Sequence, residues 1–362
     1  MSGPLTAAVI GCGRMGAFTS PDMRAYGPVC ILPSAHAEAI AMADEVALDA
    51  LCDTDSRSLD RAGILYGVDR LYADPGALLA DGAPGIVTLA TRTPGRANLI
   101  EECVAAGTRA LHIEKPLCQS VAEWERLEQL FARDDLFVTL GAMRRHWAVY
   151  KHALAMAQSG EFGALLAANA EFGARTLYWS HPHSVDLLLF AAAGARVEAV
   201  QARLGAVERN GSTVHNDPVV LDAAIWFAGG FSGHITRIPG TDWRLACETA
   251  QIAVVANGSA IWRSGRANSA QDTNPYHEPE RVPFDSPAKP EGALSPVRQL
   301  VACLQGNREA IAANAGVKRD VIIGQRILFA MVQSHLEGGR PITLDDVDPA
   351  LVIEGQTNGV PA

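Results

Sequence analysis

The first 140 residues alternate short apolar runs with segments whose apolar residues recur at helical spacing. The apolar runs predict five buried strands, at Leu5–Ile10, Val46–Cys52, Gly85–Ala90, Arg109–Ile113 and Leu136–Leu140. The segments between them predict helices, which include Ser56–Tyr66, Arg96–Ala106 and Val121–Arg133. Strands and helices in alternation indicate a parallel sheet with right-handed crossovers. We therefore predict a doubly wound parallel sheet of the α/β class over residues 1–142.

The pattern changes after residue 142 and becomes richer in strands. One helix is predicted at Tyr150–Gln158, and candidate strands follow at Leu166–Phe172, Val197–Leu204, Val219–Phe227, Gly233–Ile238 and Ile252–Val255. Strands in close succession favour a mostly antiparallel open sheet. Asn268–Gly292 has the composition of a long loop, and Val297–Leu336 predicts a helical tail. These elements predict a second α/β domain over residues 143–362.

Composition narrows the class of protein. The chain has 362 residues, which suits two domains, and it is 48% apolar and 19% charged, which is typical of a globular protein. Its net charge of −10 leaves no basic surplus for neutralising phosphates, so we expect no nucleic-acid partner. The sequence contains no run of 18 apolar residues, and we expect no membrane span.

The cysteines and the N-terminus indicate a reducing compartment. Seven cysteines are scattered along the chain without a C-x-x-C pair, which argues against both a disulfide framework and a structural zinc site. The N-terminus lacks the basic and then apolar layout of a signal peptide. We expect a cytoplasmic protein.

A glycine fingerprint follows the first predicted strand. The run Gly11-Cys12-Gly13-Arg14-Met15-Gly16 is a G-x-G-x-x-G, in which the first glycine allows a tight turn, the second admits a pyrophosphate and the third permits close packing. A helix after the glycines would present free N–H groups to the phosphates. An ordinary glycine-rich turn is the alternative. We expect residues 11, 13, 14, 15 and 16 to line a dinucleotide.

An acidic residue ends the second predicted strand and strengthens this hypothesis. Asp53 is placed to accept hydrogen bonds from the adenosine ribose, which favours NAD over NADP because a carboxylate repels a 2′-phosphate. Arg57 lies close enough in sequence to leave NADP open. The separation between Gly16 and Asp53 exceeds the usual ~20 residues, and we attribute the surplus to an insertion at Thr19–Ser34.

A lysine follows the fifth predicted strand, in the run Glu114-Lys115-Pro116. Ligands of an open parallel sheet bind beyond the carboxyl ends of its strands, so Lys115 is aimed at the cofactor crevice. An oxidised nicotinamide beside its ammonium would favour the neutral amine that acid–base chemistry uses. Pro116 restricts Lys115 to extended conformations. A surface lysine at a strand end is the alternative.

These motifs together resemble the glucose–fructose oxidoreductase, inositol dehydrogenase and MocA family (Gfo/Idh/MocA). The resemblance rests on the following segments: Gly11–Gly16, Asp53, Leu89-Ala90-Thr91, Glu114-Lys115-Pro116, Gly141–Arg145, Gly160–Gly163 and Ala330–Pro341. It implies a Rossmann domain, an open-sheet substrate domain, and redox chemistry on sugars or polyols. It places Thr91 and Glu114 at the cofactor and Arg145 near the substrate, and it implies a homodimer or homotetramer built through the second sheet.

A histidine of the second domain matches another family position. The resemblance implies that His183 opens a helix and acts with Lys115 on the substrate proton, with Asp186 orienting the imidazole from one helical turn away. A capping or core histidine is the alternative. The family often has an aspartate where Trp179 stands, so either His181 takes over part of its polar role or a different substrate stacks on Tyr178 and Trp179. Packing within the domain is the alternative for these two aromatic residues. A metal bound by the two histidines would lack a third ligand, and we expect none.

Two arginines depart from the family pattern on the cofactor side. Arg92 lies in Thr91-Arg92-Thr93-Pro94, and Arg96 stands where a histidine is common. They would suit an acidic or phosphorylated substrate, although a solvated helix start is the preferred explanation.

The combined expectation is an NAD-dependent dehydrogenase that oxidises a secondary alcohol of a carbohydrate-like small molecule. One alternative is a lyase, hydrolase or epimerase that retains NAD and oxidises its substrate transiently. Another is a sensor that binds the dinucleotide without catalysis, which would need neither Lys115 nor His183.

Overall fold

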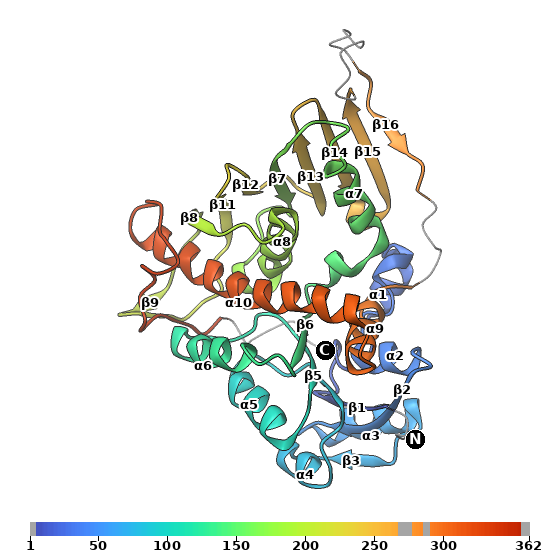
Figure 1. The fold of residues 1–362 in the computed structure, drawn as a ribbon. Helices are drawn as coiled ribbons and strands as arrows, with labels where there is room; N and C mark the ends of the chain where they lie inside the picture. The colour runs from blue at the N-terminus through green and yellow to red at the C-terminus, as the bar shows by residue number, and fades with distance from the viewer. Residues whose placement is uncertain (1–4, 267–276, 285–289, 356–362) are drawn as a thin grey trace. The chain divides into compact units, whose positions relative to one another are not determined.

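The computed structural model describes residues 5–266, 277–284 and 290–355 of the chain. Contacts between residues divide the described chain into two compact units (Figure 1). The first unit contains residues 5–143 and 290–322, and the second contains residues 144–284 and 323–355 apart from 267–276. Residues 290–322 were predicted to belong to the second domain. They pack with the first unit instead, since helix α9, Leu294–Leu304, contacts strands β5 and β6 and helix α2 of that unit.

The first unit is built around a six-stranded parallel sheet with the order β3-β2-β1-β4-β5-β6. Its strands are β1 Leu5–Ile10, β2 Val46–Cys52, β3 Arg70–Tyr72, β4 Ile86–Leu89, β5 Ala110–Ile113 and β6 Phe137–Leu140. All residues of β4 and β5 are buried, as expected for a parallel sheet covered on both faces. The strand order reverses at β1 and β4, and this switch point is where doubly wound sheets bind their ligands.

Two groups of helices cover this sheet (Figure 1). One group consists of α2 His36–Ala41, α3 Ser56–Tyr66 and α9, and the other of α4 Pro75–Ala80, α5 Arg96–Ala106 and α6 Val121–Phe131. The short helices α1, Pro21–Tyr26, and η1, Val29–Ile31, lie between β1 and α2. The doubly wound α/β fold predicted for this part of the chain is confirmed.

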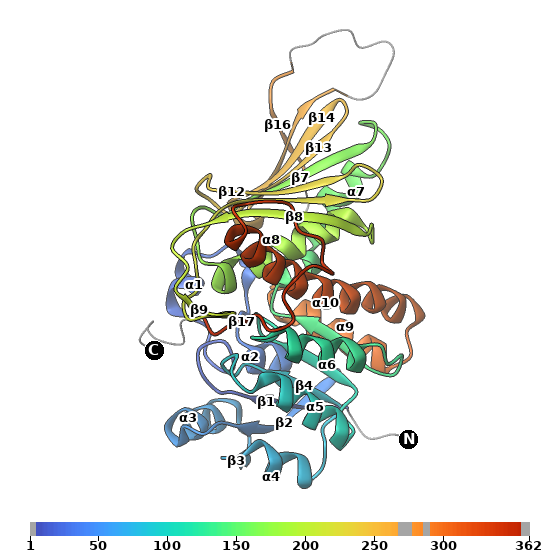
Figure 2. The same ribbon diagram turned by 90° about the vertical axis from the view of Figure 1, so that its left-hand side faces the viewer.

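The second unit is built around an eight-stranded sheet with the order β16-β15-β14-β13-β7-β12-β11-β8 (Figure 2). Its strands are β7 Leu165–Glu171, β8 Val197–Leu204, β11 Val220–Phe227, β12 Ser232–Thr236, β13 Asp242–Cys247, β14 Ala250–Val255, β15 Ala260–Gly265 and β16 Glu280–Val282. Every pair is antiparallel except β7 with β12. The predicted mostly antiparallel sheet is confirmed.

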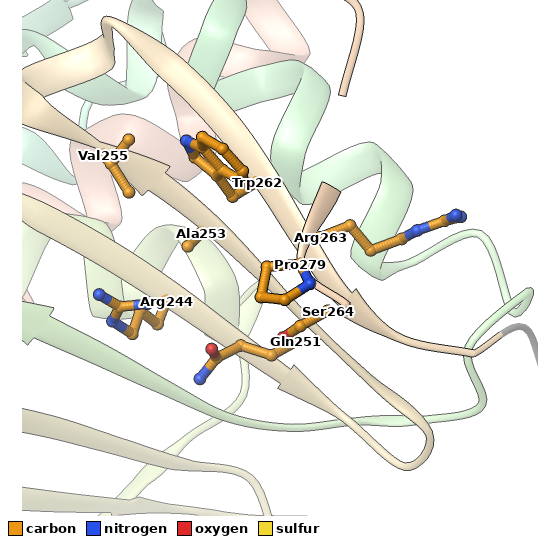
Figure 3. A pocket seen from close by; sticks show the side chains of 8 residues that line it. All are labelled: Arg244, Gln251, Ala253, Val255, Trp262, Arg263, Ser264 and Pro279. Carbon is orange, nitrogen blue, oxygen red and sulfur yellow. The ribbon is translucent and has the colours of Figure 1, made fainter. Parts of the chain in front are cut away.

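Smaller elements complete the second unit. A three-stranded sheet joins β9 Arg209–Asn210, β10 Thr213–Val214 and β17 Val352–Ile353, and the remaining short helices are η2 Met143–His146 and η3 Ala256–Gly258. Helix α7, Ala148–Ala157, packs on β13, β14 and β15, while α8, Leu177–Ala192, packs on β7, β11 and β12. Alternate strand residues face away from this core and remain partly exposed, among them Arg244, Gln251 and Trp262, which line a shallow depression (Figure 3).

The structure corrects the predicted start of the helix that carries His183. Helix α8 begins at Leu177, six residues earlier, so His183 lies in its second turn. The carboxylate of Asp217 accepts hydrogen bonds from the backbone N–H groups of Tyr178 and Trp179 at 2.7 and 3.1 Å. These bonds satisfy donors that a helix start leaves unpaired. Asp217 lies almost 40 residues further along the chain, and no local signal reveals it.

The predicted helical tail is two helices. Helix α9 ends at Leu304 and α10 runs from Arg308 to Leu336. Gly306 separates them with a φ of +80°, and Asn307 Oδ1 then accepts a 3.0 Å hydrogen bond from Ala310 N–H. Residues 268–276 and 285–289 of the predicted loop lie outside the described residues, and β16 lies between them. No helix in the described ranges is long and apolar enough to cross a membrane.

Candidate functional site

The predicted cofactor residues gather at the carboxyl edge of the first sheet. Gly11 follows β1, Asp53 follows β2, Thr91 lies two residues beyond β4, and Glu114 follows β5. Backbone hydrogen bonds continue past the strand ends, from Gly11 N–H to Cys52 C=O at 2.8 Å and from Glu114 N–H to Leu89 C=O at 2.8 Å. These bonds fix the backbone positions from which the predicted side chains project.

The three glycines of the fingerprint face different surroundings. A Cβ on Gly16 would lie 1.6 Å from the carbonyl oxygen of Gly11, so no other residue fits there. Gly11 has a φ of +97°, and a Cβ on it would lie 2.7 Å from the carbonyl carbon of Ala90. A Cβ on Gly13, in contrast, would have no atom of the described chain within 4 Å. Gly13 therefore leaves open space where a dinucleotide phosphate would approach the backbone.

The helix expected directly after the glycines is interrupted. The chain makes one turn, closed by a 2.8 Å bond from Ala17 N–H to Gly13 C=O, and departs before α2 begins at His36. The N–H groups of His36 and Ala37 then bond to the carbonyls of Met15 and Gly16 at 2.9 and 2.8 Å. Helix α2 thus continues the turn that the glycines start, with residues 18–34 inserted between the two segments. The predicted insertion at 19–34 is confirmed.

Thr19 closes the base of this insertion. Its hydroxyl oxygen accepts hydrogen bonds from the N–H groups of Ser34 and Ala35 at 3.2 and 3.0 Å and donates to Glu38 at 2.6 Å. Arg14 is exposed and Met15 is half-buried, both within the turn. The turn therefore keeps its position although the 17 residues 18–34 intervene before the helix resumes.

Asp53 connects the second strand to the glycine turn. Its Oδ2 accepts a 2.6 Å hydrogen bond from Cys12 N–H, and its Oδ1 accepts one of 2.8 Å from Asp55 N–H. Burial, followed by the charge of Asp53, raises the pKa of Cys12 and of Cys52 to about 12. These two thiols therefore stay protonated and offer no nucleophile at this edge.

Glu114 is a buried carboxylate held by charged and polar neighbours. Its Oε1 lies 3.3 Å from His36 Nε2, and its Oε2 accepts a 3.2 Å bond from Lys115 N–H. Burial opposes ionisation, but the hydrogen bond with His36 and the charges of His36 and Lys115 outweigh it, so the pKa of Glu114 lies well below its usual range. His36 was not among the predicted site residues. Its only signal is its place at the start of the helix that resumes after the insertion.

His112 forms a second buried contact of this cluster. Its ring lies 4.6 Å from that of His36, and its Nδ1 lies 2.9 Å from Thr139 Oγ1. Burial, followed by the charge of His36, lowers the pKa of His112 to about 3, so this ring is neutral at physiological pH. His112 therefore packs against the His36 ring without adding a positive charge near Glu114.

Arg96 corrects both interpretations made from the sequence. It is only 2% exposed, so it is neither a solvated helix start nor a surface cation for an acidic substrate. Its guanidinium donates hydrogen bonds to the backbone carbonyls of Glu114, at 2.5 Å, and of Pro116 and Thr91. Thr91 Oγ1 is itself buried and has no hydrogen-bond partner among the described residues. That hydroxyl is therefore available to a bound ligand.

The predicted substrate residues lie in the second unit, on α8 and the segment before α7. His183 is half-buried, and Trp179, one helical turn earlier, is 54% exposed. Asp186 pairs with Arg145, whose Nε lies 2.9 Å from Asp186 Oδ1 and whose Nη2 donates to the Asp186 carbonyl at 2.8 Å. Both side chains of this ion pair are buried. Arg145 and Asp186 are therefore tied to each other inside the unit.

His181 occupies a different environment from His183. It is fully buried, with Nδ1 at 3.1 Å from Ser184 Oγ and Nε2 at 3.2 Å from the Arg175 carbonyl oxygen. Burial lowers its pKa to about 4. Both ring nitrogens thus have partners within the unit, as in a core histidine. Among the described residues, no group of three or more His, Cys, Asp or Glu side chains could hold a metal ion.

Residues 5–142 match the family model GFO_IDH_MocA, described as an oxidoreductase family with an NAD-binding Rossmann fold. Residues 5–142 therefore carry the NAD-binding Rossmann fold of the Gfo/Idh/MocA family. The matched residues contain the glycine turn, Asp53, Thr91 and the Glu114–Pro116 turn, so the family relationship covers the dinucleotide edge described above. The residues present fit a nicotinamide dinucleotide, because Gly13 leaves open space and Thr91 Oγ1 has a vacant hydrogen-bonding capacity there.

Known relatives share shorter stretches. The chain is 35% identical over 88 residues to D-apiose dehydrogenase of Paraburkholderia graminis, covering 24% of this chain and 23% of that protein. It is 26% identical over 155 residues to myo-inositol 2-dehydrogenase of Thermotoga maritima, covering 43% and 41%. The chain thus spans less than half the length of the curated relatives that it matches.

The fold as a whole has solved counterparts. An inositol dehydrogenase homologue from Azotobacter vinelandii, solved with NADH and myo-inositol, superposes with a TM-score of 0.71 at 18% identity, covering 94% of this chain and 97% of that one. At this identity the likeness concerns the fold alone. It nevertheless includes both the parallel sheet and the open antiparallel sheet.

Proposed function

We propose that this protein is an NAD-dependent dehydrogenase that oxidises a secondary alcohol of a sugar or polyol. The observation that carries the proposal is the position of Lys115, which follows β5 at the same sheet edge as the glycine turn and Asp53. A lysine at that edge is placed for proton transfer beside a bound nicotinamide. The named activities of the relatives, on D-apiose and myo-inositol, support the substrate class.

Each residue of the first unit has a distinct task in this proposal. The backbone of residues 11–16 binds the pyrophosphate, with Arg14 and Met15 lining it, and Asp53 accepts hydrogen bonds from the ribose. The Thr91 hydroxyl and the Glu114 carboxylate border the nicotinamide side. NAD, when bound, supplies the hydride acceptor. The carboxylate of Asp53 favours NAD over NADP, since it would repel a 2′-phosphate.

The second unit supplies the substrate side of the proposal. Lys115 and His183 share the substrate proton, one taking it from the hydroxyl and the other holding it, as an amine and an imidazole can near neutral pH. Trp179 offers an exposed aromatic face for a sugar ring. Arg145 and Asp186 would support the site through their buried ion pair. We also propose that the domains divide near residue 142 and that copies associate through the second sheet.

The test is turnover by a Lys115→Met variant on a substrate found by screening sugars and polyols for NAD reduction. General acid–base catalysis contributes about 10²–10⁴ in rate. We therefore expect Lys115→Met to bind NAD as the wild type does and to lose about that factor in kcat. Lys151→Met, on the exposed side of α7, is the matched control and should keep full activity.

Two results would redirect the proposal. Wild-type turnover by Lys115→Met would remove this lysine from the mechanism. Substrate conversion by protein that retains NAD, without any change in reduced-cofactor absorbance, would favour a lyase, hydrolase or epimerase that oxidises its substrate transiently.

A further inference from the structure

Arg96 is a buried cation whose guanidinium donates hydrogen bonds to three backbone carbonyls. It is the first residue of α5 and is 2% exposed. One guanidinium nitrogen, Nη1, donates to the carbonyl of Glu114 at 2.5 Å and to that of Pro116, while Nη2 donates to that of Thr91. The first two carbonyls belong to the residues directly before and after Lys115.

Helix formation does not explain an arginine at this position. A cation near a helix N-terminus is opposed by the helix dipole, and the residue before it, Gly95, makes no side-chain cap. Burial of a charge is unfavourable unless hydrogen bonds compensate for the lost water. Burial lowers the pKa of Arg96 to about 10, with Glu114 opposing that shift, so the guanidinium remains charged at neutral pH. The three carbonyls compensate for the desolvation of Nη1 and Nη2, whereas Nε is buried without a hydrogen-bond partner among the described residues.

We infer that Arg96 is a positioning residue, which fixes the backbone on both sides of Lys115 and thereby holds the amine where it acts on the substrate proton. This inference rests on the proposed role of Lys115. The guanidinium is a rigid planar fork, so two carbonyls bound to one nitrogen and a third bound to the other cannot shift independently. The bond to the Thr91 carbonyl extends the same constraint to the loop after β4. That loop carries the Thr91 hydroxyl, which we expect to contact the cofactor.

The other side of the turn is held independently of Arg96. The N–H of Lys115 donates to Glu114 Oε2, and Glu114 Oε1 lies against His36 of α2. A Cβ on Gly141 would lie 2.6 Å from Glu114 Oε1, so the carboxylate is also enclosed from β6. Loss of Arg96 would therefore loosen the carbonyl side of the turn while the Glu114 contacts retain its overall path.

The experiment compares Arg96→Met and Arg96→Lys with the wild type, each with and without Lys115→Met. Hydrogen exchange of residues 114–119 measures directly whether Arg96 holds the backbone around Lys115. Steady-state kinetics measure what this contributes to catalysis. Because each charged hydrogen bond contributes to local stability, we expect exchange at 114–119 to rise at least about 10-fold in Arg96→Met. Displacement of a reacting group by about 1 Å lowers rates by about 10²-fold, so kcat should fall about 10- to 100-fold.

Several readouts separate positioning from general damage. KM and NAD affinity should change less than about 3-fold, because Arg96 contacts neither ligand in the proposed site, and exchange in α3 should match the wild type. Arg96→Lys keeps the charge without the fork and should recover part of kcat. In the Lys115→Met background, loss of Arg96 should lower kcat little further, since both changes remove the same contribution.

Four outcomes would overturn the inference: unchanged exchange at 114–119, unchanged kcat, loss of NAD binding in parallel with kcat, or a full additional loss of kcat in the Lys115→Met background. If Arg96→Met does not fold, Arg96→Lys alone carries these comparisons. Wild-type kcat in the single variant Lys115→Met would instead contradict the proposed function. The exchange data would then decide separately whether Arg96 fixes the backbone around Lys115.

Discussion

The backbone N–H of Cys12 donates a 2.6 Å hydrogen bond to Oδ2 of Asp53, which joins the glycine turn to the end of the neighbouring strand. The acid that would bind the ribose is thereby held by the loop that would bind the pyrophosphate. Recognition of the two parts of a dinucleotide would then be structurally coupled at this edge. Substitution of Asp53 should therefore alter which dinucleotide is preferred.

Asp53→Ser should shift cofactor use towards NADP. Removal of the carboxylate eliminates its repulsion of a 2′-phosphate, and like-charge contacts of this kind are worth at least the ~1.4 kcal/mol that a tenfold change represents. We expect the NADP-to-NAD ratio of kcat/KM to rise about tenfold or more. Asp55→Ser is the matched control, because it removes the same charge two residues away while serine still caps α3. An equal shift in both variants would indicate a general charge effect.

The glycines at 13 and 16 should respond in opposite ways to alanine. The methyl group of Gly16→Ala would collide with the Gly11 carbonyl, and overpacking of this kind costs about 1–3 kcal/mol or more. At roughly 2–4 °C per kcal/mol, the Tm of Gly16→Ala should fall by several degrees. Gly13→Ala has open space and should keep its Tm, yet lose NAD affinity at least tenfold because the methyl group obstructs the phosphate. Thermal melts and NAD titrations of both variants check this, and a normal Tm for Gly16→Ala would contradict it.

Local sequence signals were sufficient for most of the fold. The strands Leu5–Ile10 and Val46–Cys52 have the predicted bounds because each is a mostly apolar run that is followed by a glycine or an acid. Strand β13 was not predicted, although Trp243, Leu245 and Cys247 alternate with partly exposed neighbours, as is typical of a half-buried strand. This alternation extends over only a few residues, and many loop sequences show the same alternation.

Contacts between distant residues account for what the sequence could not reveal. The start of α8 depends on Asp217, and the junction of α2 with the glycine turn depends on contacts of His36 and Ala37 with residues 21 positions earlier. Arg96 is a surface residue by every local criterion, and its burial follows only from the carbonyls that converge on it. The candidate site was thus predictable in its motifs but not in the residues that hold them.

The second sheet should mediate association of copies of this chain. Its outward face bears Trp262, 39% exposed, beside Arg244 and Gln251 in the depression of Figure 3. Light scattering should give a mass above the 38.3 kDa of one chain for the wild type and a shift towards that value for Trp262→Asp. Ile64→Asp changes an 86% exposed apolar residue of α3 and should leave the mass unchanged. A monomeric wild type would refute this prediction.

His112 should make the protein sensitive to acid. Its folded-state pKa of about 3 lies below its ordinary value of 6.5, so the unfolded chain binds an additional proton between these values. The stability that this group contributes is complete above about pH 6.5 and declines as the pH falls, by at most ~1.4 kcal/mol per pH unit. Urea unfolding of His112→Asn at pH 7, 6 and 5 should show a shallower decline than the wild type. His152→Asn, at an exposed histidine, should decline in parallel with the wild type.

The ion pair of Arg145 and Asp186 should act on stability, in contrast to the catalytic contribution proposed for His183. Breaking a buried pair leaves an uncompensated charge and costs about 3–5 kcal/mol, so Arg145→Met should lower the Tm by roughly 6–20 °C. Asp186→Asn should lower it as well, since the buried Arg145 guanidinium would lose its charged partner. His183→Asn should keep the wild-type Tm and lose most of its turnover. If Asp186 chiefly oriented the imidazole, Asp186→Asn would instead reproduce the kinetics of His183→Asn at a normal Tm, and melts paired with kcat values for the three variants distinguish these roles.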